Sequence, residues 1–353
     1  MDKILKCFLF ISIAIFCNIE LLHSRSEDSK FVFIMSFPDE TSEKAGEYLA
    51  TPYDLVFYKE QYFITDSKEN CIKVFSSDGK LLKKIGSRGQ GPREFSDPYC
   101  ITLDEKKGQI YCYDGGNRRI SCFSVNGEFI KFIKTSLSIW DMKFHNGNLY
   151  SSAYSDANQS HLMIYDEAGN IKKFYGTLFD NKINNLPHTY KQILYGNALL
   201  DVNKDNLFLF FEYLPFVQIY DKEGNLEQSI KVNIKEIKKR YKINQNPKRR
   251  GSRMGIHSWL FGACVSGDEL FCYSPYQLEC MLVMNKNGKL TRKIHFDKTV
   301  THDQLIRRRF IKKNGDNFIF IDLGTSKVII FQEEKSNDSS SLKIDKQNFL
   351  YKN

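Results

Sequence analysis

The sequence contains little proline and tryptophan, and no apolar run of membrane-spanning length follows its first residues. Its 353 residues include only 8 prolines and 2 tryptophans. This composition excludes a collagen-like chain, a low-complexity chain and a coiled coil. A helix needs roughly 20 consecutive apolar residues to cross a bilayer, so we expect no transmembrane helix in the mature chain. With 42% hydrophobic residues, the chain can still bury a core.

Sequence motifs of the common hydrolases and metal sites are also missing. There is no G-x-S-x-G nucleophile motif, no H-E-x-x-H zinc motif and no calcium-binding EF-hand loop. No two cysteines form a C-x-x-C pair, which argues against a zinc or redox motif. The histidines are scattered along the chain. We therefore expect no catalysis and no cofactor from motifs alone.

The cysteines give no clear disulfide framework. Seven remain after the N-terminal segment, and an odd number leaves at least one thiol unpaired within a single chain. Most lie between strand-forming residues, where a thiol fills space as a small apolar side chain. The alternative is a cross-strand disulfide between Cys112 and Cys122, which flank one predicted hairpin. The seven are Cys71, Cys100, Cys112, Cys122, Cys264, Cys272 and Cys280.

The first 24 residues have the pattern of an export signal. Lys3 and Lys6 form a short positive region, and an almost wholly apolar run from Phe8 to Phe16 follows. We therefore predict a signal peptide over residues 1–24 and a periplasmic or cell-envelope protein. The alternative is a lipoprotein anchored at Cys17, although the preceding residue is a phenylalanine rather than the usual small residue.

Aromatic residues and positive charge are what the sequence has in excess. It contains 28 Phe and 19 Tyr, and such residues favour strands. The 51 Lys and Arg outnumber the 42 Asp and Glu, so the formal net charge is +9. This excess by itself does not choose between a nucleic acid, a membrane surface and no partner, but part of it gathers in two connections that we expect to flank one face, which favours an anionic ligand or surface. Because export removes the chain from the cytoplasm, we expect no nucleic acid among its partners.

A recurring unit organises the chain. Each copy has a strand that ends in a large apolar residue, a turn that ends in glycine, and a further strand. Glycine supplies the positive φ that tight hairpins need. Two more strand-like runs precede each turn, so a copy has four antiparallel strands, as propeller blades do and helical solenoid repeats do not. The five turn glycines are Gly79, Gly127, Gly169, Gly224 and Gly288.

A sixth copy near the C-terminus lacks its fourth strand. Its third strand ends at Phe331, and no glycine turn follows. The spare N-terminal run Phe31–Ile34 can supply the missing strand and close the ring without an open edge. The predicted fold is therefore all-β, a six-bladed β-propeller of four-stranded antiparallel blades closed by the N-terminal strand. We expect it to occupy residues 25–335, with a polar tail over residues 336–353.

Two segments of the second copy carry a family resemblance. The connection Ile85–Phe95 resembles a G-x-G-x-G-P-x-E-[FY] pattern, and the hairpin Tyr113–Ile120 resembles D-x-x-N-x-R-I. On these segments the chain resembles the six-bladed propellers of the NHL-repeat and TolB-like type that Bacteroidetes export. The hairpin pattern fades to Asn70-Cys71 in the first copy and is absent from the third to fifth copies. The resemblance implies the fold and leaves the function open.

The candidate site is the rim of the central pocket. Inter-blade connections and the turns between second and third strands open on the same face, where propellers usually bind ligands. For Asp114 and Asn117 the alternative is turn architecture, since aspartate caps nearby backbone N–H groups. The candidate rim residues are Arg88, Arg93, Asp114, Asn117, Arg118, Arg250, Arg253, His257, Trp259 and Arg307.

The connection between the fourth and fifth copies is strongly basic. Ile234, Ile237 and Tyr241 fall at helical spacing among lysines and arginines, which predicts an amphipathic helix. This helix is either a solvated basic surface over the rim or a lid that attracts anions. Trp259, at the end of the connection, is a packing residue or a stacking platform.

A short helix is predicted in the last connection. Thr301 and Gln304 have the spacing of a capping box, and the run Arg307–Arg309 follows. These arginines enter the rim of an inner strand and add positive charge there.

Two functions are compatible with this pattern. We expect an exported module that binds a small anionic ligand, a peptide, a glycan or an envelope protein on its loop-rich face, without catalysis. The alternative is a metal-assisted hydrolase or lyase, in which carboxylates converge on a central Ca²⁺ or Zn²⁺. The candidate carboxylates, each of which can instead cap a turn, are Asp66, Asp114, Glu212 and Asp322.

Overall fold

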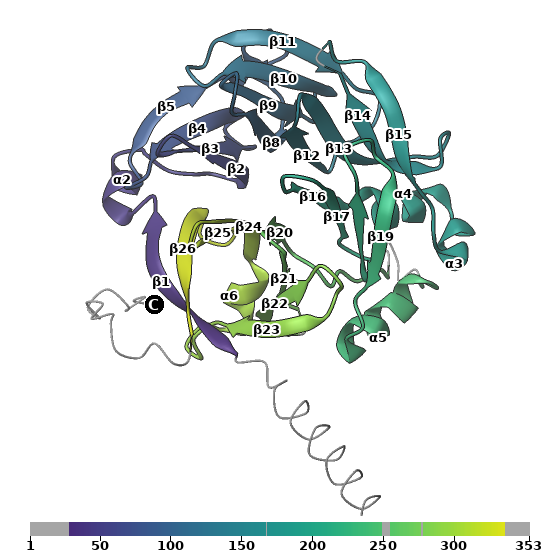
Figure 1. Cartoon of the computed structure of the whole chain (residues 1–353). Coiled ribbons are helices and arrows are strands. Elements are labelled where there is room, and N and C mark those ends of the chain that lie inside the picture. Colours follow the sequence, from purple (N-terminus) through teal and green to yellow (C-terminus); the bar gives the residue numbers. More distant parts are fainter. Residues whose placement is uncertain (1–27, 167, 249–254, 277, 336–353) are drawn as a thin grey trace, which may run out of the picture.

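The chain forms antiparallel sheets arranged around a central axis (Figure 1). The computed structural model describes residues 28–335, except residues 167, 249–254 and 277. The predicted signal peptide, Cys17 and the predicted C-terminal tail lie outside the described residues, as do Arg250 and Arg253. The architecture is an all-β, propeller-like fold with four-stranded antiparallel blades.

Four sheets have four strands each, and strands that follow each other in sequence lie side by side. The first two sheets are β2 (Pro52–Tyr58), β3 (Gln61–Asp66), β4 (Cys71–Ser76) and β5 (Leu81–Ile85), then β8 (Pro98–Asp104), β9 (Gln109–Asp114), β10 (Arg119–Ser124) and β11 (Phe129–Lys134). The next two are β12 (Asp141–His145), β13 (Asn148–Ser155), β14 (Ser160–Tyr165) and β15 (Ile171–Thr177), then β16 (Ala198–Val202), β17 (Leu207–Phe211), β18 (Phe216–Tyr220) and β19 (Leu226–Lys231).

Eight of the remaining strands form one sheet in which the N-terminal strand joins two groups, while β6 (Ser87–Arg88) and β7 (Glu94–Phe95) form a short parallel pair. One group is β20 (Ala263–Ser266), β21 (Glu269–Ser274), β22 (Cys280–Asn285) and β23 (Leu290–His295). The other is β24 (Arg308–Asn314), β25 (Asn317–Asp322), β26 (Lys327–Glu334) and β1 (Ser29–Phe37). The strand β1 runs antiparallel to β26 from Lys30 to Phe37, as predicted, but pairs with β23 only through Ser29 and Lys30.

Apolar side chains hold β1 in this position. Phe31 is buried, and its ring centroid lies 4.7 Å from that of Phe296 and 5.0 Å from that of Phe318. Such aromatic contacts each contribute about 0.5–1.5 kcal/mol beyond burial. The N-terminal and C-terminal parts of the chain are thereby joined in one core.

The glycine turns are present at the predicted positions, all with positive φ. Gly79 has φ of 86°, and a Cβ atom there would lie 2.6 Å from the Cβ atom of Phe37. The turn therefore needs glycine for both its conformation and its close contact with β1.

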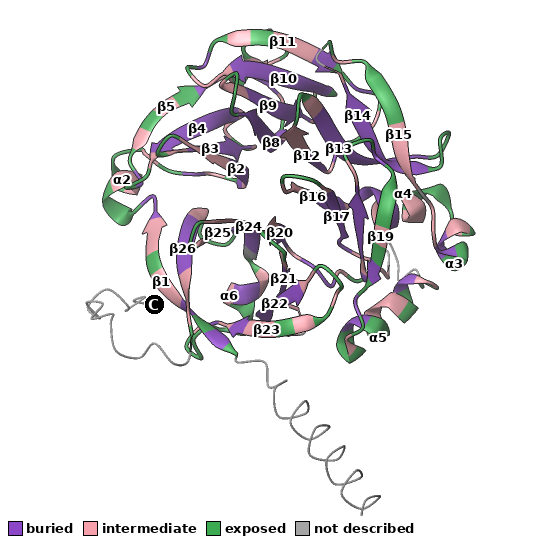
Figure 2. Cartoon of the chain, in the orientation of Figure 1, coloured by how far each residue is buried: buried purple, intermediate pink, exposed green. Residues whose placement is uncertain are grey.

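Burial is greatest in the middle strands of each sheet. Figure 2 shows second strands such as β9 and β17 buried and outer strands such as β11 and β19 largely exposed or half-buried. The innermost strands β2, β12 and β20 are partly buried. Third strands such as β10 and β22 are almost continuously buried. Aromatic and β-branched side chains fill the space between neighbouring sheets.

The seven cysteines of the described chain are buried free thiols. Cys112 pairs in register with Ser121, whereas Cys122 pairs with Tyr111. Because neighbouring residues of a strand point to opposite faces, Cys112 and Cys122 lie on opposite sides of their sheet. The alternative of a Cys112–Cys122 disulfide is therefore wrong.

Five helices lie in the connections of the described chain. They are α2 (Glu40–Lys44), α3 (Asn181–Asn184), α4 (His188–Gly196), α5 (Lys235–Asn244) and α6 (His302–Ile306). The helix predicted in the basic connection is present as α5. The capping box of Thr301 and Gln304 opens α6, as predicted. Within the ranges that the structure describes, no helix is long and apolar enough to cross a membrane.

Side chains of the innermost strands connect each sheet to the next. Each of these strands is the edge of its sheet and lies close to the axis. The N–H groups on its unpaired edge have no partner strand and need another acceptor. Aspartates of the preceding sheet provide it through Oδ2: Asp54 for Ile101 at 3.0 Å, Asp141 for Leu200 at 2.8 Å and Asp201 for Val265 at 2.7 Å. The hydroxyl of Thr102 accepts from the N–H of Phe144 in the same way, at 2.9 Å.

We predict that Asp141→Ala destabilises the fold substantially. The substitution leaves the buried N–H groups of Met142 and Leu200 without their acceptors, at a cost of about 2–4 kcal/mol in the free energy of unfolding. Chemical denaturation measures the loss, with the exposed Asp205→Ala as the control. Equal stabilities of the two variants would contradict the role of the aspartate.

Candidate functional site: the central pocket

A cavity of about 780 Å³ lies at the centre of the fold, where connections and turns from several sheets meet. Its walls include the start of β2, the end of β17, α5, the residues before β20 and the turn between β25 and β26. Ligand pockets in proteins commonly have volumes of about 300–1,000 Å³. The cavity is therefore large enough for a small organic ligand.

Aromatic side chains form much of the pocket wall. Tyr53 and Trp140 line it from two different sheets, and Tyr99 lies between their rings. The Tyr53 and Tyr99 rings are stacked with centroids 3.4 Å apart, and Trp140 lies 5.8 Å from Tyr99. Tyr213, Phe261 and Tyr276 also line the cavity. Such walls offer flat apolar surfaces on which a ring can stack.

Arg309 of β24 brings a buried positive charge to the pocket. It is 9% exposed, and its guanidinium lies 4.2 Å from the Tyr53 ring centroid. Its Nη1 donates a long hydrogen bond of 3.4 Å to the Tyr53 carbonyl, which also joins the last strand group to the first sheet. Burial by itself lowers the pKa of Arg309, but Tyr53 and Asp54 raise it above its usual value. The group therefore stays charged.

Arg240 of α5 brings a second guanidinium to the same cavity. Its Nη1 donates to the Ser258 carbonyl at 2.7 Å, and its centre lies 5.6 Å from the Tyr276 ring centroid. Its Nε is buried and has no hydrogen-bond partner in the described part of the chain. Burial lowers the pKa of Arg240 from its usual value, which reflects incomplete compensation of its charge.

Glu212 supplies the carboxyl group of the pocket. It directly follows β17 and is 7% exposed. Its backbone N–H donates to Asn197, and its carbonyl accepts from Trp259, so its position is fixed. Burial raises the pKa of Glu212 from 4.5 to about 7, against the opposing effects of Arg309 and the Tyr213 and Ser258 hydroxyls. Near neutral pH the carboxyl is therefore present in both protonation states.

The other candidate metal ligands are occupied by structural contacts. Asp66 binds Lys73 at 2.8 Å and accepts from the Ala50 N–H at 2.8 Å. Asp322 accepts from the N–H groups of its own turn, at Gly324 and Thr325. Within the part of the chain that the structure describes, no three His, Cys, Asp or Glu residues are grouped to hold a metal ion. Glu212, which is one methylene longer than aspartate, lines the pocket instead.

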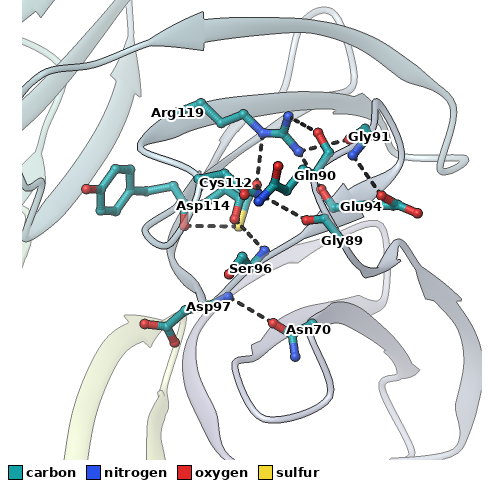
Figure 3. A network of polar contacts seen from close by, with 12 residues as sticks. Asn70, Gly89, Gln90, Gly91, Glu94, Ser96, Asp97, Cys112, Asp114 and Arg119 are labelled. Carbon is teal, nitrogen blue, oxygen red and sulfur yellow. Dashed lines mark hydrogen bonds and ion pairs between the residues drawn. The ribbon is translucent and has the colours of Figure 1, made fainter.

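Asp114 and Asn117 belong to a hydrogen-bonded cluster that holds the Ile85–Phe95 connection against its neighbouring hairpin (Figure 3). Its centre is Arg119, whose Nε binds Asp114 at 2.9 Å. The same guanidinium donates to the carbonyls of Gln90, Gly91 and Glu94, at 2.7, 2.9 and 2.8 Å. Asn117 donates to Asp114 and to the Gly89 carbonyl. This cluster stabilises loop architecture and lies outside the pocket lining.

The other predicted rim residues are dispersed. His257 lines the pocket, whereas Arg88, Arg93, Arg118 and Arg307 are exposed and do not. Trp259 is 2% exposed. Its indole N–H donates to the Phe211 and Leu214 carbonyls at 2.9 and 2.8 Å, which makes it a packing residue.

Of the side chains named from the sequence, Glu212 and His257 line the pocket, as does one arginine of the run Arg307–Arg309. In the run Arg307–Arg309, Arg307 ends α6, whereas Arg309 lies within β24 and lines the pocket. Side chains alternate between the two faces of a strand. This alternation could distinguish an arginine that faces the pocket from its neighbours only if the residue at which the strand begins were known. Tyr53 and Trp140 carry no distinguishing signal among many aromatic residues.

A narrow charged region adjoins the pocket along the axis. A void of about 20 Å³ is lined by Asp54, Asp141, Lys143 and Arg309. Burial would lower the pKa of Lys143, but Asp141 and Asp201 raise it above its usual value. Since little space remains among these side chains, the pocket has a charged floor.

The geometry defines an all-β, propeller-like protein with an aromatic and charged pocket at its centre. More narrowly, the chain belongs to the family described as "Domain of unknown function (DUF4934)", whose model matches residues 40–352. No curated protein matches the sequence significantly.

Solved structures share the architecture at low sequence identity. A Bacteroides fragilis protein provisionally described as exported is 12% identical, with 88% of this chain and 96% of that chain covered and a TM-score of 0.56. Virginiamycin B lyase from Staphylococcus aureus is 12% identical, with coverages of 86% and 99% and a TM-score of 0.53. The Pan2 WD40 domain of Neurospora crassa is 10% identical, with coverages of 80% and 74% and a TM-score of 0.50. At these identities the likeness shows the fold alone.

We predict that Arg119 is needed for stability. Arg119→Gln removes the buried ion pair with Asp114 and the bonds to three carbonyls, which lowers the free energy of unfolding by about 3 kcal/mol. The neighbouring exposed Arg118→Gln is the matched control and changes stability by about 0.5 kcal/mol or less. Chemical denaturation compares the two, and an equal effect would contradict the assignment.

We predict that Glu212→Gln stabilises the protein above pH 7. A carboxyl whose pKa is raised on folding contributes stability below its unfolded pKa and loses it as the pH rises from 4.5 to about 7. The glutamine side chain does not titrate. The free energy of unfolding of the variant therefore exceeds that of the wild type by at most about 3 kcal/mol at pH 8 and by little at pH 4. Thermal denaturation across this pH range tests the prediction, with the exposed Glu223→Gln as the control. A difference that does not vary with pH would contradict it.

Proposed function

We propose that this protein is an exported propeller that binds a small molecule in its central pocket without transforming it. The observation that carries the proposal is the 780 Å³ cavity itself, with its aromatic walls and its two arginines. Concave, largely apolar cavities with a few polar groups are the usual form of ligand sites. The predicted binding region was the loop-rich face, and the proposed site is one cavity on that face.

We further propose that the propeller has six blades of the NHL-repeat and TolB-like type. The eight-stranded sheet counts as two blades because Ser29 and Lys30 alone connect β1 to β23, whereas β1 pairs with β26 along most of its length. The motif segments Ile85–Phe95 and Tyr113–Ile120, which suggested this type, bind each other through the Arg119 cluster. Export rests on the sequence of residues 1–24.

We propose that ligand binding at this pocket needs no divalent cation. The lining combines one carboxyl group with two guanidiniums, Arg240 and Arg309. Hard cations prefer several oxygen ligands, and nearby positive charges oppose them. A small organic partner therefore suits the pocket better than a metal, and a nucleic acid is not expected outside the cytoplasm. Peptides, glycans and envelope proteins on the wider rim stay alternatives to be tested.

A lyase or hydrolase is the second candidate, and one observation favours it. Glu212 has a pKa of about 7 in a buried pocket, which suits a group that both donates and accepts protons near neutral pH. The fold is also that of virginiamycin B lyase. Turnover of a bound compound, lost in Glu212→Gln, would establish this candidate in place of simple binding.

We predict that blocking the pocket abolishes binding. Saturation-transfer NMR with a panel of monosaccharides, small organic acids and dipeptides identifies compounds that bind the wild-type protein. Thr51 is exposed and lines the pocket, so Thr51→Trp fills part of the cavity. We expect binding to fall at least tenfold in this variant.

The matched control is Thr41→Trp in α2, where the side chain is exposed and away from the pocket lining. It keeps wild-type affinity if the pocket is the site. The proposal fails if no panel member binds, or if binding survives in Thr51→Trp.

A further inference from the structure

The pocket contains two guanidiniums whose hydrogen-bonding capacity is largely unused. A guanidinium has five N–H donors. Arg240 makes one hydrogen bond in the described part of the chain, to the Ser258 carbonyl, and its Nε has no partner. Arg309 makes one, the 3.4 Å contact with the Tyr53 carbonyl. Buried donors that lack partners destabilise the empty protein, and a ligand that accepts from them removes this cost.

Neither guanidinium has a carboxylate partner. Among the described residues, no Asp or Glu oxygen lies within 4.0 Å of a nitrogen of Arg240 or Arg309. By contrast, Arg119 and Arg292, which have structural roles, bind carboxylates directly. The nearest acids to Arg309 along the axis, Asp54 and Asp141, already accept backbone N–H groups with their carboxylates. Both pocket arginines are therefore available to an anion.

The charge balance of the lining also favours an anion. The described lining holds two arginines against one carboxyl group, that of Glu212. Burial raises the pKa of Glu212 to about 7, so at neutral pH it cancels only part of their charge. The cavity therefore has an excess of between one and two positive charges, which matches a singly charged ligand better than a neutral one.

The aromatic walls add a second requirement. The side chains of Tyr53, Trp140, Tyr213 and Tyr276 line the same cavity, and Tyr99 is stacked on Tyr53 and tilted against Trp140. Flat apolar surfaces of this kind favour a ring over an extended chain. Arg309 already lies over the Tyr53 ring, so an anion bound to it sits beside an aromatic face.

We propose that the pocket binds a ring-bearing small carboxylate, whose carboxylate group accepts hydrogen bonds from Arg240 and Arg309 while its ring packs on the tyrosine and tryptophan side chains. The planar fork of an arginine matches the two oxygens of a carboxylate. This inference rests on the proposed function, because it names the ligand class of the same pocket. The ring can be that of a sugar acid or of an aromatic acid, and these two sources share the chemistry.

Compounds that share a ring but differ in charge distinguish the contribution of the carboxylate to the affinity from that of the ring. The sugar set is glucuronate, glucose and glucose 6-phosphate, and the aromatic set is 2-naphthoate and 2-naphthamide. Isothermal titration or saturation-transfer NMR at pH 6.5 measures their affinities. We expect at least one carboxylate to bind about tenfold or more tightly than its neutral counterpart, which corresponds to about 1.4 kcal/mol, and more tightly than the phosphate.

Variants assign the effect to the arginines. Arg240 lies on the half-exposed helix α5, so we expect Arg240→Gln to fold as the wild type does, which a melting curve checks. We expect this variant to weaken carboxylate binding about tenfold and to leave binding of the neutral compound within about twofold. Lys239→Gln, on the exposed face of the same helix, is the control and changes neither. Arg309→Gln has the same expected effect, and a melting curve checks that this buried position still folds.

The pH dependence gives an independent readout. The groups that interact with Glu212 are Arg309, Ser258 and the tyrosines Tyr53, Tyr99, Tyr213 and Tyr276. Arg240 and His257 line the same pocket. As the pH rises from 6 to 8, Glu212 ionises and its charge opposes the bound carboxylate. We expect carboxylate affinity to fall severalfold over this range, and to fall clearly less in Glu212→Gln, in which only the His257 imidazole of the lining can still change its charge.

The outcomes separate this inference from the proposed function. If neutral and charged members bind equally, or if the phosphate binds best, the carboxylate inference is overturned while pocket binding stands. If neither set binds, the inference is overturned for both ring types, and the wider panel with Thr51→Trp decides on pocket binding itself. Carboxylate selectivity that survives in both arginine variants also overturns it.

Discussion

The structure depends on how the innermost strands satisfy their backbone N–H groups. These strands are edges buried near the axis, where an unpaired N–H costs about 1–3 kcal/mol. Asp54, Asp141 and Asp201 each supply the missing acceptor to the following sheet. The contact between Arg309 and the Tyr53 carbonyl connects the last strand group to the first sheet. The same ring of contacts therefore holds the sheets together and places the pocket walls.

This arrangement explains why the polar groups near the axis have different roles. Aspartates are short, and at the ends of the second strands they bind backbone N–H groups, as Asp114 does for Ser96 and Asp322 for its own turn. Glu212 occupies the corresponding position after β17, and its longer side chain lines the cavity with a raised pKa. Arg240 and Arg309 reach the same cavity without a carboxylate partner among the described residues. Arginines elsewhere in the fold, such as Arg119, bind carboxylates of the protein, whereas the two arginines of the cavity can contact a ligand.

The repeat made most of the fold predictable. Glycine turns, four strands per copy and the pairing of the N-terminal strand all follow from local patterns of apolar residues and turn residues, which need no knowledge of distant contacts. The site was predictable in part: Glu212 and His257 were individual candidates and line the pocket, whereas Tyr53 and Trp140 carried no signal that distinguished them. Asp114 and Asn117 belong to a recognisable motif, and the guanidinium that binds Asp114 is that of Arg119, the arginine of this motif, whereas the candidate Arg118 is exposed. Neighbouring residues of a strand point to opposite faces, so an error of one position replaces a buried side chain with a solvent-exposed one.

The sequence alone determined the all-β class, the blade-sized repeat and the excess of positive charge, because these depend on composition and on neighbouring residues. The tertiary structure decided which side chains face the axis. Tyr53, Trp140, Glu212 and Arg309 are far apart in sequence and come from different sheets. Closing the sheets around one axis brings them into a single cavity. Burial there raises the pKa of Glu212, while Tyr53 and Asp54 keep Arg309 charged against the effect of burial. Both effects arise from desolvation and nearby charges, which exist only once the sheets have assembled.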